Sequence, residues 1–311
     1  MADFKKYILC GAAGLMTVLS GCQTTGEDTS ARAILKETAS RTIEDGGTGP
    51  YKALMASDST LPTHTIFRPK DLDVFGRKAK LPIIAWGNGA CANSPWEHVN
   101  FLSEVASHGF LVVAIGPMPA AGQRGGAGGT TKSSMMTDAI SWAIAQNSDP
   151  TSQYYHKLDT TKIAVSGMSC GGLQTLEVAP DARITTAMIC DSGILSDPGS
   201  GMGGMPNLTK GQLEKLHTPV IYILGGETDI AYNNGMDDFH RINHLPVFAA
   251  NLNVGHGGTY SRPHGGEFAI VASAWFQWQL KGDKEAAKMF EGEPCGVAKM
   301  AGWKAEKKNI P

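Results

Sequence analysis

A serine lies between two glycines in the segment KIAVSGMSCGGLQTLEVA, residues 162–179. Gly167 precedes Ser169 by two residues and Gly171 follows it by two, which gives the pattern G-x-S-x-G. A serine hydroxyl is a weak nucleophile until a base takes its proton and N–H donors stabilise the oxyanion. A sharp strand-to-helix turn supplies this geometry beside the free N–H groups of a helix N-terminus. The apolar run before the pattern and the helical run after it predict such a turn, with Ser169 as nucleophile.

Cys170 is the alternative nucleophile in this segment. A turn centred on Cys170 would place Met168, not glycine, two residues upstream, whereas Ser169 has glycine at that distance on both sides. The spacing therefore favours Ser169, and the amide of Cys170 becomes the first predicted oxyanion donor. A glycine-rich turn with an inert serine is the non-catalytic interpretation.

A catalytic acid and a histidine should follow the serine, in the order Ser…Asp…His. The loop GGETDIAY after a late apolar run contains the predicted acid, Asp229. Asp191 in ICDSG and Glu227 are alternatives, because they also follow apolar runs. The predicted base is His256 in NLNVGHGGTY, where glycines allow a loop to reach the serine, and His264 is the second candidate.

The second oxyanion donor is expected in the loop WGNGAC, residues 86–91. Its glycines allow close approach of the backbone, and Asn88 occupies the position of the expected donor amide. Trp86 is expected to pack in the core.

The remaining chain alternates short apolar runs with helical patterns, which predicts an α/β fold with a mostly parallel sheet and helices on both faces. Several runs are apolar throughout, as in strands covered on both faces. Strands are expected at 63–68, 81–86, 110–115, 162–166, 185–190, 219–224 and 246–252, and helices at 132–146 and 268–280. A further helix is expected between Ser94, with Pro95 and Glu97 completing its N-terminal signals, and Gly109. We expect one domain at 50–311.

Composition limits the partners and cofactors. Charged residues make up 18% of the 311 residues and the net charge is -2, so a nucleic-acid partner is not expected. The glycine-rich stretch 122–130 lacks the lysine of a phosphate-binding loop and is interpreted as a loop beside the site. His240 and His244 lie one helical turn apart, but the HExxH glutamate is missing. No cofactor or metal is expected.

The N-terminus has the pattern of a targeting segment. Lys5 and Lys6 precede the apolar run 8–19, which is too short to span a bilayer. The following LSGC resembles the lipobox of bacterial lipoproteins, which implies a signal peptide at 1–21, acylation of Cys22 and a lipid anchor in the cell envelope. Gln23 after the cysteine implies the outer membrane. An ordinary signal peptide is the alternative. Residues 22–49 are interpreted as a polar tether with one short helix around 31–42.

The chain resembles the α/β-hydrolases, within them the group of poly(ethylene terephthalate) hydrolases, cutinase-like polyester hydrolases, chlorophyllases and dienelactone hydrolases. The similar segments are GPYKA, LPTHTIFRP, GMSCGG, GGETDIAY, VGHGGTY and SAWFQWQLKGDKEAAKMF. The resemblance implies a serine esterase acting on a small-molecule or polymeric ester. The chain departs from the polyester enzymes at Cys170, where they usually have Met, and at Asn88, where they have an aromatic residue.

Other functions fit the same residues. A peptidase or an acyltransferase would use the same triad, because fold and triad do not fix the leaving group. A non-catalytic lipoprotein that binds a ligand is the third reading. The acyl and alcohol pockets are expected in the loops 117–131 and 196–212.

The resemblance also suggests a disulfide. In the α/β-hydrolase sheet, the strand ending at Trp86 is expected beside the strand ending at Ser166, so Cys91 and Cys170 would lie in adjacent loops. A Cys91–Cys170 bond would hold the two oxyanion donors together. Unlinked thiols, or a bond of Cys295, are the alternatives, since four cysteines permit three pairings.

Overall fold

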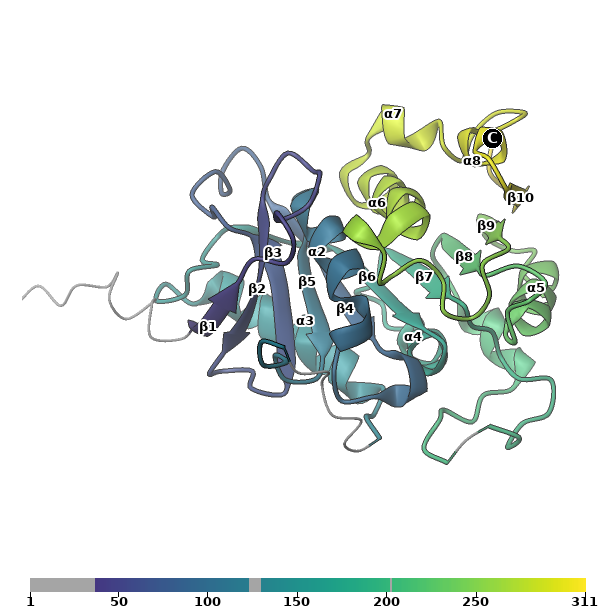
Figure 1. Ribbon diagram of the computed structural model, residues 1–311, viewed down its shortest axis with the longest axis horizontal. Coiled ribbons are helices and arrows are strands. Elements are labelled where there is room, and N and C mark those ends of the chain that lie inside the picture. The colour runs from purple at the N-terminus through teal and green to yellow at the C-terminus, as the bar shows by residue number, and fades with distance from the viewer. Residues whose placement is uncertain (1–36, 123–129, 202) are drawn as a thin grey trace, which may run out of the picture.

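A single mixed sheet forms the centre of the molecule (Figure 1). The computed structural model describes residues 37–122, 130–201 and 203–311. Ten strands in these residues are ordered β1-β2-β3-β5-β4-β6-β7-β8-β9-β10. Their bounds are β1 Glu37–Arg41, β2 Ala53–Asp58, β3 His64–Pro69, β4 Leu81–Gly87, β5 Leu111–Ile115, β6 Leu158–Met168, β7 Thr186–Cys190, β8 Val220–Leu224, β9 Val247–Leu252 and β10 Trp303–Lys308. Strands β4 to β9 are mutually parallel, while β1, β2, β3 and β10 pair antiparallel.

Helices cover both faces of the sheet. The α-helices are α2 Val99–Ser107, α3 Ser134–Ser148, α4 Cys170–Val178, α5 Tyr232–Arg241, α6 Gly266–Lys281, α7 Lys284–Ala287 and α8 Gly296–Lys299. Short 3-10 turns are η1 Gly89–Cys91, η2 Trp96–His98, η3 Lys210–Lys215 and η4 Pro263–Gly265. Apolar side chains of α3, α4 and α5 form one core with the sheet, and those of α2 and α6 form the other. The predicted fold class is confirmed.

The central and edge positions of the strands agree with the burial of their side chains. Every residue of β4, β5 and β7 to β9 is buried, as expected for parallel strands between two helical layers. Strand β10, with the sequence WKAEKK, lies at an edge and exposes several of its charged residues. Charged edge strands resist pairing with other chains.

The seven predicted strands correspond to β3 through β9, whereas β1, β2 and β10 were not predicted as strands. The helix predicted around 31–42 is wrong in its described part, because Glu37–Arg41 is β1 and pairs with β2. Arg68 reaches across from β3 to bind the Glu37 carboxylate at 2.5 Å. This pairing with a distant strand decides the conformation of a segment whose local sequence suggested a helix.

The folded domain also begins earlier than residue 50. The amide of Thr48 donates to Glu104 of α2 at 2.8 Å, and the amide of Gly49 donates to Ser107 Oγ at 2.9 Å. Residues 37–49, predicted as part of a tether, are therefore packed on the domain. The predicted signal peptide at 1–21 and Cys22 lie outside the described residues.

The helix expected from Ser94 begins later. Residues 96–98 form η2, and α2 begins at Val99. Ser94 Oγ accepts the Trp96 amide at 3.3 Å, so the expected capping box with Glu97 does not form. Gly109 follows the end of the helix with a φ of +81°, as a glycine in that position can.

Candidate active site

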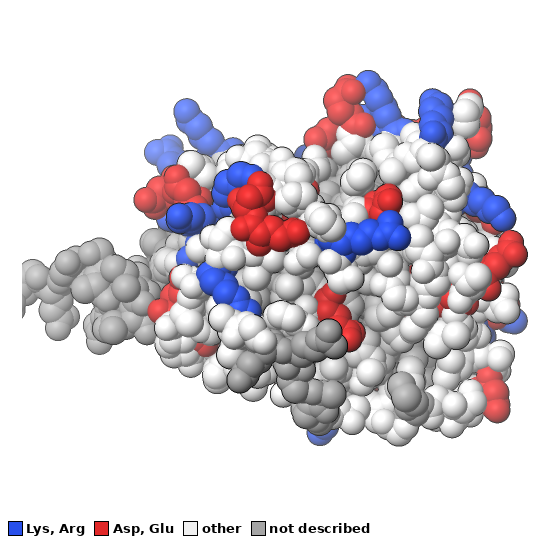
Figure 2. Space-filling model, in the orientation of Figure 1, with Lys and Arg blue, Asp and Glu red and all other residues white. Residues whose placement is uncertain are grey.

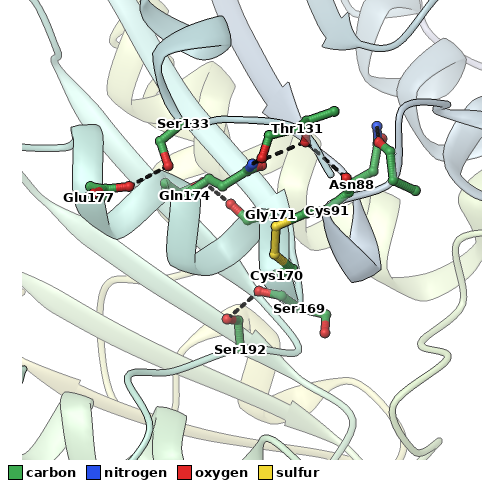
Figure 3. Close-up of a disulfide and its surroundings, with 12 residues drawn as sticks. Asn88, Cys91, Thr131, Ser133, Ser169, Cys170, Gly171, Gln174, Glu177 and Ser192 are labelled. Atoms are coloured by element: carbon green, nitrogen blue, oxygen red, sulfur yellow. Dashed lines mark hydrogen bonds between the residues drawn. A yellow bond between two sulfur atoms is a disulfide. The ribbon is translucent and has the colours of Figure 1, made fainter. Parts of the chain in front are cut away.

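Ser169 occupies the turn between β6 and α4. Its φ is 53° and its ψ is -116°, a strained conformation for a residue with a side chain. Its amide donates to the Cys190 carbonyl at 2.9 Å, and its carbonyl accepts from Ser192 Oγ at 2.6 Å (Figure 3). The same carbonyl also accepts from the Gly172 and Leu173 amides in the first turn of α4. The backbone of the serine is thus fixed from both sides.

The glycines around Ser169 are required by close packing. A Cβ on Gly171 would collide with the carbonyl of Gly87, at the end of β4, and would lie 2.7 Å from the Asn88 nitrogen. A Cβ on Gly167 would lie 2.8 Å from the same Gly87 oxygen, and one on Gly172 would be 2.6 Å from Ser192 Oγ. Only glycine permits the N-terminus of α4 to lie against the loops after β4 and β7.

Ser169, His256 and Asp229 form a continuous chain of hydrogen bonds. His256 Nε2 lies 3.0 Å from Ser169 Oγ, and His256 Nδ1 lies 2.6 Å from Asp229 Oδ1. Asp229 follows β8 and His256 follows β9, so the strand order brings together residues separated by up to 87 positions. Parallel strands end on one edge of the sheet, which is where the three loops meet.

The Asp229 carboxylate is held by backbone donors as well. Its Oδ1 accepts the Ala231 amide at 2.8 Å, and its Oδ2 accepts the Gly225 amide at 3.2 Å. Burial raises the pKa of this carboxyl, but the hydrogen bonds from His256 and Ala231 outweigh that effect and hold the pKa below its usual value. Asp229 is therefore charged at neutral pH.

The other acid candidates lie in different surroundings. Asp191 is buried behind Asp229, and its Oδ2 accepts from Tyr260 Oη at 2.6 Å. Glu227 is exposed and pairs with Lys304 at 3.3 Å, away from the serine. Asp229 is therefore the one of the three acid candidates that contacts His256.

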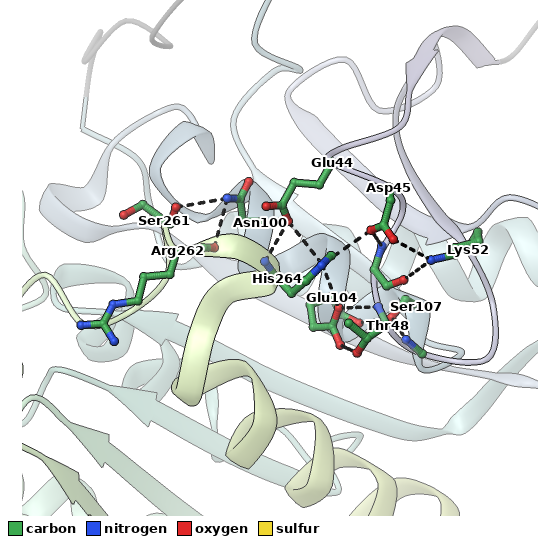
Figure 4. Close-up of polar contacts among 12 residues, drawn as sticks. Glu44, Asp45, Thr48, Lys52, Asn100, Glu104, Ser107, Ser261, Arg262 and His264 are labelled. Atoms are coloured by element: carbon green, nitrogen blue, oxygen red, sulfur yellow. Dashed lines mark hydrogen bonds and ion pairs between the residues drawn. The ribbon is translucent and has the colours of Figure 1, made fainter. Parts of the chain in front are cut away.

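His264, the second histidine candidate, does not reach Ser169. Its Nδ1 lies 3.4 Å from Glu44, 3.7 Å from Asp45 and 3.7 Å from Glu104 (Figure 4). Its amide also donates to Glu44 Oε2 at 2.8 Å. His264 therefore joins the loop that follows β9 to the N-terminal segment and to α2.

Cys170 carries no free thiol, because a disulfide joins it to Cys91 (Figure 3). The two Cα atoms are 5.1 Å apart, and both side chains are buried. The bond connects η1, which follows β4, with the first residue of α4. Cys190 and Cys295 are free and buried.

The two predicted oxyanion donors belong to the two segments that the Cys91–Cys170 disulfide joins. The Cys170 amide is the first of α4, and no intrahelical acceptor exists for it. The Asn88 amide, in the loop after β4, lies against Gly171 of α4. Among the described backbone hydrogen bonds outside the helices and strands, neither amide is a donor. The Asn88 side chain is engaged elsewhere: its Nδ2 donates to Ile115 O at 2.7 Å, and its Oδ1 accepts from Trp86 Nε1 at 3.1 Å.

A cavity of about 810 Å³ is bordered by Met168, the residue before the serine. Its described lining comes from residues 88–100, from Met168 and from residues 257–261. The expectation that the loops 117–131 and 196–212 form the pocket is not met by this cavity. Residues 123–129 and 202 lie outside the described residues, and a separate cavity of about 200 Å³ lies along 195–208.

Sequence reasoning missed His98 and Tyr260. The His98 ring lies 5.1 Å from Trp86 and 5.0 Å from Tyr260, measured between ring centroids. Burial lowers the pKa of His98 to about 3, so the ring is neutral at physiological pH. Both residues border the cavity, and the sequence marks Tyr260 only by its position four residues after His256.

The histidine pair of HRINH does not form a metal site. His240 lies 3.8 Å from Glu306, whereas His244 Nε2 bonds the Leu216 carbonyl at 2.9 Å. In residues 37–122, 130–201 and 203–311, no group of three or more His, Cys, Asp or Glu side chains has the geometry to hold a metal ion.

The mostly parallel sheet, the serine at the β6–α4 turn and the partners after β8 and β9 define the α/β-hydrolase fold. Residues 72–192 match the family model described as "PETase: PET hydrolase-like". The match includes the Asn88 loop and Ser169 but ends before Asp229 and His256. It points to a hydrolase acting on esters. No curated protein matches the chain at a significant level.

Proposed function

We propose that the protein is a serine hydrolase that cleaves a carboxylic ester through an acyl-enzyme. The proposal depends on one observation above all, the hydrogen-bonded chain Ser169–His256–Asp229. The family match over residues 72–192 supports an ester as the substrate.

In the proposed mechanism, His256 Nε2 takes the proton of Ser169 as Oγ attacks the ester carbonyl carbon. The amides of Cys170 and Asn88 donate to the oxyanion. His256 then gives its proton to the leaving alcohol, and the acyl-enzyme forms. A water molecule activated by the same histidine releases the acid and restores Ser169. The charge of Asp229 orients Nδ1–H and stabilises the imidazolium throughout.

The cavity supports an uncharged substrate. Trp96, Met168 and Tyr260 provide apolar surface, and Glu97 is the one charged residue in its described lining. No cation lines this part of the cavity to bind an anionic group. On the face in Figure 2, acidic and basic side chains are interspersed and a broad area is uncharged. These features favour neutral esters over substrates with a carboxylate or phosphate near the scissile bond.

A fluorophosphonate probe and a panel of matched esters and amides test the proposal. Ser169→Ala should abolish probe labelling and ester turnover while leaving the circular dichroism unchanged. Ser148→Ala, on the exposed side of α3, is the matched control and should retain both. Labelling without ester turnover would favour the peptidase or acyltransferase, and no labelling would favour a binding protein.

We also propose that the enzyme is anchored in the cell envelope, on its outer membrane, through a lipid on Cys22. The support is the segment LSGC after a short apolar run. The described chain contains no helix long and apolar enough to cross a membrane. Cys22→Ser should stop incorporation of labelled fatty acid and move the protein to the aqueous phase in detergent partition. An unchanged partition would contradict the anchor.

A further inference from the structure

Asp191 is a second carboxyl group directly behind the proposed triad. It follows β7, its exposed fraction is 0%, and its φ of 41° is unfavourable for a residue with a side chain. Its Oδ2 accepts from Tyr260 Oη at 2.6 Å, whereas its Oδ1 is buried without a conventional donor. A buried carboxylate oxygen without a donor is costly, so this atom calls for an explanation.

The segments that carry Asp191 and Asp229 lie side by side, because the Asp191 amide donates to the Ile223 carbonyl of β8 at 2.8 Å and the Gly225 amide, two residues further along, donates to Asp229 Oδ2 at 3.2 Å. No lysine or arginine of the described chain forms an ion pair with either group, and the His256 ring contacts Asp229 but not Asp191. Two adjacent buried carboxylates repel each other strongly, so such a pair holds one proton.

The surrounding donors decide which carboxyl holds that proton. Asp229 accepts from His256 Nδ1 and from two backbone amides, all of which favour its charged form. Asp191 accepts from Tyr260. Burial, and then the charge of Asp229, raise the pKa of Asp191 well above its usual value, while the pKa of Asp229 is lowered. Asp191 is therefore the protonated member.

The other titratable groups that face Asp191 carry no charge at neutral pH. Burial raises the pKa of the Tyr260 phenol, which comes from the loop after β9. Burial also raises the pKa of the Cys190 thiol, the preceding residue on β7. Neither group competes with Asp191 as a base, so Asp229 is the acceptor to which its proton can be donated.

We propose that Asp191 is a positioning residue that stays protonated in the active enzyme and donates a hydrogen bond from Oδ1 to the Asp229 carboxylate. The chain Tyr260–Asp191–Asp229–His256 then extends the triad by two buried residues. Asp191 fills one acceptor site of Asp229, and so keeps its other oxygen directed at His256. This inference depends on the proposed function, since it assigns Asp229 as the acid of the triad.

Two substitutions of Asp191 distinguish a hydrogen bond donated to Asp229 from a role in packing alone. An amide at position 191 can donate to Asp229 and accept from Tyr260, so Asp191→Asn should keep turnover and probe labelling within about threefold of wild type. Asp191→Ala removes the donor to a charged group and should lower both by about tenfold to a hundredfold. Thermal unfolding identifies any variant that fails to fold.

Asp238→Asn is the matched control. Asp238 is also a buried aspartate near a tyrosine, with Tyr222 Oη at 3.4 Å, but Lys210 binds it at 2.6 Å and it does not contact the triad. Its substitution should leave turnover unchanged. Burial raises the pKa of Asp238 to about 6, so this group is ionised at pH 8 and gives no signal of a protonated acid there.

Infrared spectroscopy at pH 8 tests the protonation state directly. The carbonyl band of a protonated carboxylic acid should be present in wild type and in Asp238→Asn, and absent in Asp191→Asn and Asp191→Ala. A band unchanged in Asp191→Asn, or an equal loss of turnover in the Asn and Ala variants, would overturn the inference. Failure of the proposed function is distinguishable, because the wild type would then lack ester turnover, or would keep it in Ser169→Ala, whatever the band shows.

Discussion

Removal of the Cys91–Cys170 disulfide should cost mainly stability. The bond closes a loop with a sequence separation of 79 residues. In the chain-entropy description, a loop of that length restricts the unfolded chain by about 4.5 kcal/mol at 25 °C. Domains of this kind have about 5–15 kcal/mol in total. We therefore expect Cys91→Ala/Cys170→Ala to lose up to about 4.5 kcal/mol of unfolding free energy, a large share of the total.

The effect on turnover should be smaller, because other bonds hold the loop that contains Asn88 and Cys91. Asn88 Nδ2 donates to Ala92 O at 2.9 Å and to Ile115 O at 2.7 Å. The Cys91 carbonyl accepts from the amide and the hydroxyl of Thr131, each at 3.0 Å. These contacts survive the substitution. We expect kcat to fall by less than about tenfold, against the 10²–10³ typical of a lost oxyanion donor.

Urea unfolding followed by tryptophan fluorescence measures the first quantity, and turnover of a neutral ester at saturating substrate measures the second. Cys295→Ala is the matched control, since it removes a buried free cysteine without opening a bond. An unfolding free energy within 1 kcal/mol of wild type would refute the reasoning. A hundredfold loss of kcat at unchanged stability would show that the disulfide itself positions the donors.

Three further outcomes follow from single side chains. Gly171→Ala should abolish probe labelling, because its Cβ would collide with the Gly87 carbonyl and displace the turn that holds Ser169. The pKa of His98 falls from 6.5 to about 3 on folding. Between these values the unfolded chain binds a proton that the folded chain does not, so the free energy of unfolding is highest above pH 6.5 and decreases as the pH falls toward 3. His98→Phe should therefore lose about 3 kcal/mol less than wild type between pH 7 and pH 4, measured by urea unfolding. His264→Ala should speed amide hydrogen exchange at residues 44–48, and unchanged exchange would contradict its role in holding that segment.

Local patterns in the sequence were sufficient to predict the turn at Ser169 and most of the strands and helices around it. The strands β3 to β9 are apolar runs, and α3, α4 and α6 have apolar faces of helical period, so both were predicted from spacing. The G-x-S-x-G pattern predicted a strand-to-helix turn because the required close approach excludes side chains at Gly167 and Gly171. The order Ser169, Asp229, His256 is also a property of the chain itself.

Tertiary structure decided everything that depends on which segments become neighbours. Residues 37–41 form a strand because β2 offers unpaired backbone groups, a fact that no local window contains. The cavity is lined by residues 88–100 and 257–261 because the loops after β4 and β9 meet beside Met168. Asp191 and Asp229 both follow apolar strands, and the sequence ranks them only by order. The adjacency of β7 and β8 sets the two carboxyl groups side by side, and only then does the electrostatic cost of two buried charges determine which one is ionised.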